Sequence, residues 1–213
     1  MKTLLTLSCA ILAAVSFAQV RQTEGSGNAR KETRSVPAFS QIVLEGAIEA
    51  EVFTGSKPGV TLQFDDNLLK QIETRVEGDS LIVRPKGSYT SKLELKAWIT
   101  LPQLKGAIIR GSGNLIGKNI STPACALAIE GVGDITLTGK VGALSATVSG
   151  SGSMALRQFQ AESVNAIISG TGNLDLYASK SLNGNISGTG SIKYAGSPKV
   201  KSQVSGTGTI SKN

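Results

Sequence analysis

Residues 147–192 read TVSGSGSMALRQFQAESVNAIISGTGNLDLYASKSLNGNISGTGSI, and this stretch decides the fold. It contains three Gly-x-Gly tripeptides, which begin at Gly150, Gly170 and Gly188. Apolar and polar residues alternate on both sides of each tripeptide, and a period of two is that of a β-strand. Each tripeptide therefore marks a corner between two strands, because glycine tolerates positive φ and close packing.

The same pattern extends over the whole second half of the chain. Further tripeptides begin at Gly111, Gly131 and Gly206, so the first glycines of successive copies are 20, 19, 20, 18 and 18 residues apart. Two columns of the aligned copies are apolar throughout. They contain Ile109, Ile129, Val148, Ile168, Ile186 and Val204 before the glycines, and Leu115, Ile135, Met154, Leu174, Ile192 and Ile210 after them.

A single repeat of this kind does not fold alone, because its few inward side chains do not offset the backbone entropy lost on folding. Stacking adds main-chain hydrogen bonds and a continuous core. No copy has the 3.6-residue apolar period of a helix. The sequence therefore predicts an all-β protein, a single-stranded parallel β-helix with about 18–20 residues per coil.

The chain begins with the features of a secretory signal peptide at residues 1–18. Lys2 is basic, the apolar run at 4–15 is too short to span a bilayer, and small residues flank Phe17 at the expected cleavage site before Gln19. We expect export to the periplasm, the outer surface or the medium. No transmembrane span is expected after removal of the signal peptide.

The remaining chain divides into a short extension at 19–35 and a β-helix domain at 36–213. Its coils are expected to be irregular and β-rich at 36–104 and regular at 105–213. Within the irregular part, Asp65-Asp66-Asn67 is expected to cap a short helix that begins at Leu68. The tetrapeptide Glu77-Gly78-Asp79-Ser80 predicts a hairpin turn.

The composition excludes several kinds of active site. The chain of 213 residues has no histidine, which excludes Ser-His-Asp and Cys-His triads and His-ligated metals. After cleavage only Cys125 remains, and its place in an apolar column predicts a buried, unreactive thiol. Glu45, Glu49 and Glu51 share the outward parity of one strand segment, so they form either a cation or acid/base site or a solvated face, and we favour the solvated face. We expect no catalytic residue, cofactor or metal.

Three polar columns around the glycines are the candidate ligand-binding residues. In a stacked coil they form ladders, which serve either to bind an extended polymer such as a glycan or to satisfy corner backbones. Trp98 either stacks on a sugar or packs beneath residues 19–40. The ladder residues are Asn114, Asp134, Asn173, Ser149, Ser169, Ser187, Ser205, Thr171, Thr189 and Thr207.

The order of motifs resembles the bacterial family called "putative auto-transporter adhesin, head GIN domain". The resemblance is carried by Gly25-Ser26-Gly27-Asn28, Arg30-Lys31-Glu32-Thr33-Arg34, Val36-Pro37-Ala38-Phe39, Asp66-Asn67-Leu68-Leu69 with Ile72-Glu73, and the glycine series from Gly111 to Gly208. It implies a right-handed β-helix, an exported cell-envelope protein and a role in adhesion, with no established catalytic residues. Glu45-Gly46-Ala47-Ile48-Glu49 stands where a Gly-Ile-Asn tripeptide is expected.

Three functions stay open from the sequence. The favoured one is a non-enzymatic binding or adhesion module that presents β-helix faces to a glycan or a cell-surface protein. The alternatives are a polysaccharide-active enzyme and a self-assembling envelope protein, a homo-oligomer that stacks through an uncapped C-terminal coil. Nucleic acid is not an expected partner, because the basic residues are dispersed and aromatic residues make up only 4%.

Overall fold

The computed structural model describes residues 22–213. The predicted signal peptide and its cleavage site lie outside the described residues. Within them, no helix is long and apolar enough to cross a membrane. The described chain consists of strands and a short 3-10 helix.

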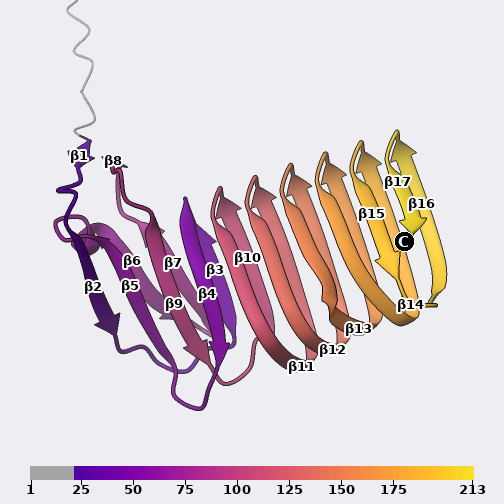
Figure 1. Ribbon diagram of the computed structural model, residues 1–213, viewed down its shortest axis with the longest axis horizontal. Coiled ribbons are helices and arrows are strands. Elements are labelled where there is room, and N and C mark those ends of the chain that lie inside the picture. The colour runs from indigo at the N-terminus through magenta and orange to yellow at the C-terminus, as the bar shows by residue number, and fades with distance from the viewer. Residues whose placement is uncertain (1–21) are drawn as a thin grey trace, which may run out of the picture.

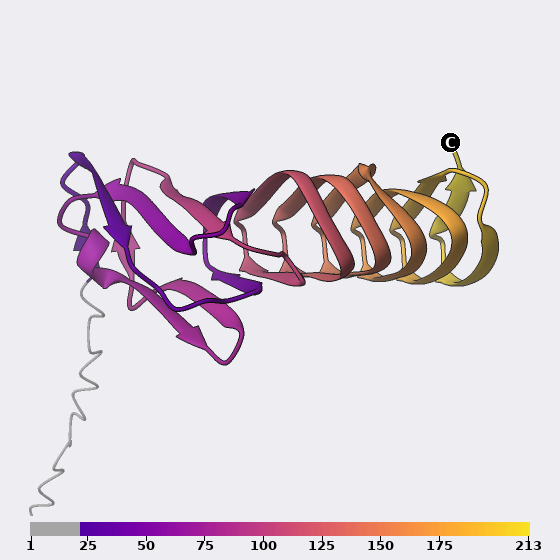
Figure 2. The same cartoon turned by 90° about the horizontal axis from the view of Figure 1, so that it is seen from below.

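The second half of the chain is a parallel β-helix (Figures 1 and 2). Ile129 lies opposite Val148, and Val148 lies opposite Ile168, which confirms the predicted stacking in register. The elements are β10 (Gly106–Gly111), β11 (Asn114–Gly131), β12 (Asp134–Gly150), β13 (Ser153–Gly170), β14 (Asn173–Gly188), β15 (Ser191–Ala195), β16 (Lys199–Gly206) and β17 (Thr209–Lys212).

Each long strand bends, so a coil presents two long walls and a third short wall. We call face A the outer surface of the wall formed by β10, the C-terminal parts of β11–β14, and β16. Face B is the outer surface formed by the N-terminal parts of β11–β14 with β15 and β17. The short wall includes residues 120–122 and the residues stacked on them. Faces A and B meet at the Gly-x-Gly corner.

The corner requires glycine for a reason that involves the neighbouring coil. Gly150 has a φ of +148°, which L side chains rarely adopt, and a Cβ at this position would meet the carbonyl oxygen of Gly131 one coil below. The second glycine of this tripeptide, Gly152, has the same relation to Gly133. The repeat therefore keeps both glycines because the backbones of stacked coils meet at this corner.

The N-terminal half continues both walls in a less regular way. Face A extends from β10 through β3 and β7 to β6, and face B extends from β11 through β4, β9 and β5 to β2. The elements are β1 (Thr23–Glu24), β2 (Ala29–Arg34), β3 (Gln41–Glu45), β4 (Ile48–Thr54), β5 (Gly59–Asp65), η1 (Leu69–Gln71), β6 (Ile72–Glu77), β7 (Ser80–Pro85), β8 (Tyr89–Thr90) and β9 (Leu95–Leu101).

Strand pairing in this half confirms one local prediction. β6 and β7 are antiparallel and joined by a tight turn at Gly78, whose φ is +59°. The predicted hairpin at residues 77–80 is therefore present. Antiparallel pairs also join β2 to β5 and β5 to β9, which explains why this half lacks the repeat of the stacked coils.

The predicted cap at residues 65–67 is wrong. The 3-10 helix is preceded by Leu68, and no side chain caps it. The Asp65 carboxylate is instead fully buried and accepts hydrogen bonds from the Gly27 N–H and the Ser91 hydroxyl. Asn67 accepts one from the Ser26 N–H at 3.0 Å. These side chains therefore hold the extension at residues 24–28 against the sheet, a long-range contact that local sequence does not reveal.

The proposed single strand through the three glutamates is also wrong. Gly46, with a φ of +100°, turns the chain between β3 and β4, so it occupies the place of a first corner glycine. Glu45 consequently belongs to face A, whereas Glu49 and Glu51 belong to face B. The three carboxylates do not share one surface.

The core is a continuous apolar column inside the coils. The inward row of Ile109, Ile129, Val148, Ile168 and Ile186 is at most 3% exposed. Cys125 is 3% exposed, as predicted, and burial raises its pKa to about 12. A thiol in this state is not a nucleophile at neutral pH.

Candidate functional site

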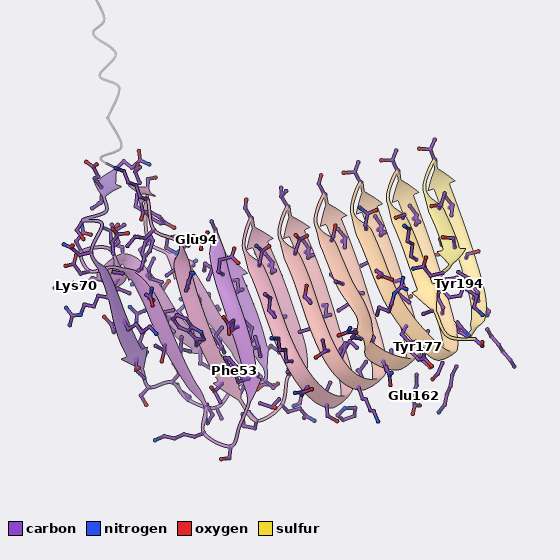
Figure 3. The ribbon with its side chains drawn as sticks, in the orientation of Figure 1. Phe53, Lys70, Glu94, Glu162, Tyr177 and Tyr194 are labelled. Carbon is purple, nitrogen blue, oxygen red and sulfur yellow. The ribbon has the colours of Figure 1, made fainter. Side chains whose placement is uncertain are left out.

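Exposed hydroxyl groups follow the Gly-x-Gly corner from coil to coil. Figure 3 shows the short side chains that project from the tips of successive coils. We call this surface the hydroxyl ridge. It consists of Ser149, Ser169, Ser187 and Ser205 on the face A side, and Ser151, Thr171, Thr189 and Thr207 at the tip, all of them exposed.

The ridge is regular because parallel pairing fixes its spacing. Ser149 lies opposite Ser169, and Ser169 lies opposite Ser187. Neighbouring strands are about 4.8 Å apart, so each coil repeats the same pair of hydroxyls at that interval. Thr171 donates a hydrogen bond to Ser151 at 2.9 Å, which links two coils along the tip.

The third predicted polar column lies on face B, and its side chains make hydrogen bonds within the protein. The Asn114 Oδ1 accepts a hydrogen bond from the Asp134 N–H at 3.0 Å, and Asp134 accepts one from the Ser153 N–H at 2.8 Å. Asn173 accepts one from the Ser191 hydroxyl at 2.7 Å. These side chains bind the next coil, so they act first as corner residues and have less capacity for a ligand than the ridge has.

Trp98 also lies on face B, on β9, and it is half-buried. The Lys31 Nζ of β2 lies 4.5 Å from the centre of its ring, which is a cation–π contact. Its neighbours in the sheet are Glu51 on β4 and Thr61 on β5. Because Lys31 covers a face of the ring, the arrangement favours packing beneath the extension over stacking on a sugar.

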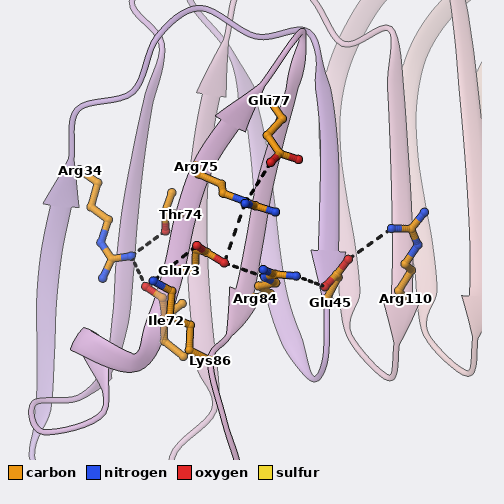
Figure 4. A network of polar contacts seen from close by, with 10 residues as sticks. All are labelled: Arg34, Glu45, Ile72, Glu73, Thr74, Arg75, Glu77, Arg84, Lys86 and Arg110. Atoms are coloured by element: carbon orange, nitrogen blue, oxygen red, sulfur yellow. Dashed lines mark hydrogen bonds and ion pairs between the residues drawn. The ribbon is translucent and has the colours of Figure 1, made fainter.

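A row of alternating charges precedes the ridge on face A (Figure 4). Arg84 lies 2.7 Å from Glu73 and 3.7 Å from Glu45, and Arg110 lies 3.2 Å from Glu45 and 2.8 Å from Glu130. The hydrogen bond from Arg84 lowers the pKa of Glu73, and Glu73 in turn raises the pKa of Arg84. The row joins five adjacent strands, so we interpret it as a structural connection between the two halves.

Sequence reasoning missed two features of face A. The charged row joins residues as far apart in sequence as Arg110 and Glu45, and no repeat pattern indicates it. The second feature is an apolar groove beside the short wall, lined in part by Ala124, Ala126 and Ala143. A signal for the groove exists in the sequence, because the positions seven and five residues before Gly131 and Gly150 contain only alanine and serine.

The chain is similar to known proteins over most of its length. The family model described as "Putative auto-transporter adhesin, head GIN domain" matches residues 38–198. No curated protein sequence is significantly similar to the chain.

Three solved structures have a similar fold. A putative adhesin from Bacteroides fragilis is 22% identical, with a TM-score of 0.73 over 89% of this chain and 99% of that one. A putative lipid binding protein from Parabacteroides distasonis is 24% identical, with a TM-score of 0.61 over 91% and 100%. A putative adhesin from Parabacteroides merdae is 17% identical, with a TM-score of 0.55 over 90% and 99%. At these identities the likeness concerns the fold alone.

Proposed function

Because the chain belongs to the family described as "Putative auto-transporter adhesin, head GIN domain", we propose that it is a non-enzymatic, exported adhesion module that binds an extended glycan along the hydroxyl ridge. The observation that carries this proposal is the ridge itself. Two hydroxyls per coil repeat in register along the corner, and all eight side chains are exposed.

The chemistry of the ridge suits a polysaccharide. Hydroxyl groups donate and accept hydrogen bonds, as sugar hydroxyls do, and short side chains lose little entropy when they are held by a ligand. Successive coils are about 4.8 Å apart, which sets the interval between hydroxyl pairs. A polysaccharide that runs parallel to the solenoid axis therefore meets an equivalent pair of hydroxyls at each coil of the ridge.

Glycan-array retention of the purified protein tests this proposal. The double variant Thr171→Val, Thr189→Val keeps the shape of both side chains and removes two hydroxyls. If each hydroxyl makes one hydrogen bond to the glycan, as donor or acceptor, worth about 0.5–1.5 kcal/mol, retention should weaken by roughly fivefold or more. The matched control is Thr100→Val, Thr136→Val, which removes two hydroxyls from face B.

Two results would contradict the proposal. Equal retention of both double variants on a glycan that the parent protein binds would place the contact elsewhere. Release of reducing or unsaturated ends from that glycan would show turnover, and the protein would then be an enzyme.

A further inference from the structure

Face A is hollowed where it meets the short wall, well away from the hydroxyl ridge. The groove has a volume of about 710 Å³ and crosses successive coils from Lys105 to Ser181. Its sides come from small outward residues in two neighbouring columns. They include Ala124, Ala126, Ala143, Ser145, Ser163 and Asn165.

The groove is long and narrow because it runs across the strands. The column that contains Lys105 continues through Leu144 and Val164 to Leu182, one residue per coil. Five coil positions at about 4.8 Å give a length of about 19 Å along the solenoid axis. A rod-shaped ligand therefore fits better than a compact one.

The floor of the groove is apolar, since Cys125, Leu144 and Val164 line it, and part of its polar rim is already hydrogen-bonded within the protein. The strand backbones on both sides already pair with the coils above and below. Thr122 donates to the Ala124 carbonyl at 3.1 Å, and Asn183 donates to Asn165 at 2.9 Å. A peptide or a glycan would leave polar groups unsatisfied where it lies against the floor of Leu144 and Val164, whereas a hydrocarbon chain has none to satisfy.

The charged side chains that line or continue the groove are basic. None of the described residues that line it is acidic, and Lys105 lies at one end, 3.8 Å from Asp79. At the other end, Lys199 lies opposite Ser181 and Lys201 lies opposite Asn183, so both lysines continue the columns of the groove. The ion pairs of residues 22–213 include neither of them.

We propose that the groove binds the hydrocarbon chain of a single-chain anionic amphiphile, such as a fatty acid. The chain lies along the solenoid axis over Leu144 and Val164. The carboxylate meets the ammonium groups of Lys199 and Lys201, which have no acidic partner in the described residues, whereas Lys105 is shared with Asp79. This site is separate from the hydroxyl ridge and does not depend on glycan binding.

Fluorescence titration with cis-parinaric acid, below its critical micelle concentration, tests the site. We expect saturable binding by the parent protein. Ala143→Phe fills the groove from an exposed position and should weaken binding at least tenfold. Ala155→Phe is the control, because Ala155 is an exposed outward alanine on face B. Thermal unfolding of both variants shows that each is folded.

A charge experiment tests the orientation of the ligand. The double variant Lys199→Gln, Lys201→Gln should weaken binding several-fold and reduce its dependence on salt. The double variant Lys193→Gln, Lys212→Gln makes the same charge change on β15 and β17, outside the wall that contains Lys199 and Lys201, and should have no effect. The methyl ester of the probe should bind both lysine variants equally.

The proposal is overturned if the probe fails to saturate, or if Ala143→Phe and Ala155→Phe bind it equally well. It is also overturned if a hydrophobic peptide, and not the fatty acid, binds in a manner that Ala143→Phe abolishes. In each case, a glycan-array assay of the Ala143→Phe variant tests the hydroxyl ridge independently, because this substitution changes the groove and leaves the ridge residues intact.

Discussion

Replacement of Gly152 by alanine is the sharpest test of the stacked corner. The new Cβ would lie 2.8 Å from the Ile129 Cγ2 and closer still to the carbonyl oxygen of Gly133 in the coil below. Both neighbours belong to the tightly packed corner, and the oxygen is part of the backbone. The two coils must therefore separate locally by on the order of 1 Å to restore ordinary van der Waals contact.

The loss of stability can be estimated from the hydrogen bonds that this separation of the coils weakens. The Ser151 N–H donates to the Gly131 carbonyl at 3.0 Å, and the Ser153 N–H donates to the Asp134 carboxylate at 2.8 Å; both bonds join these two coils. Weakening two such bonds costs about 1–3 kcal/mol, and overpacking adds about 1–3 kcal/mol. We expect the free energy of unfolding to fall by about 2–6 kcal/mol, which lowers Tm by roughly 5–20 °C in a protein of this size.

Thermal and urea unfolding followed by circular dichroism measure this change. Gly59→Ala is the control, because a Cβ there has no neighbour within 4 Å, and alanine restricts the unfolded chain more than glycine does. The corner argument fails if Gly152→Ala unfolds within about 0.5 kcal/mol of the parent with an unchanged m-value.

The further predictions concern three side chains. Cys125, with its pKa raised to about 12 by burial, should react with a thiol reagent at pH 8 only as fast as the protein unfolds, so prompt labelling would contradict its burial. Because that folded pKa exceeds the reference value of 9.0, its contribution to stability should be lost as the pH rises from about 9 to 12, which urea unfolding of the parent against Cys125→Ala measures. Asp65→Asn weakens the acceptor of the Gly27 N–H, so backbone amide hydrogen exchange at residues 24–34 should be faster. Unchanged exchange would contradict the inference that Asp65 holds residues 24–28 against the sheet. The pKa of Glu73 is lowered from 4.5, mainly by its hydrogen bond with Arg84. The stability that this carboxylate contributes is therefore present above pH 4.5 and lost as the pH falls below it. Glu73→Gln should flatten this part of the pH profile of Tm.

The amount that could be predicted from sequence differs between the two halves. In the repeats, the alternation around Gly150 and Gly170 fixes which side chains point inward, because a period of two and a constant spacing leave only one in-register stacking. The hydroxyl ridge was predictable for the same reason. Its residues precede or lie between the glycines in every copy from Ser149 to Thr207.

Single residues in the irregular half were harder to place. Asp65 precedes a short helix and looks like a cap, yet its carboxylate binds a loop that is 38 residues away in sequence. Glu45 and Glu49 share a parity, yet Gly46 turns the chain between them onto different faces. In both cases a long-range packing choice prevailed over a local preference, and no repeat was present to indicate it.

The sequence by itself determined the coil, its register and its inward columns, because six glycine-marked copies constrain one another and a slip by one residue would turn the core outward. Only the tertiary structure decided what the outer surfaces present. The groove beside Ala143, the charged row from Glu73 to Glu130 and the cover over Trp98 arise where different coils and strands meet. Contacts of this kind depend on which elements become neighbours in space, and the order of residues within one repeat does not contain that information.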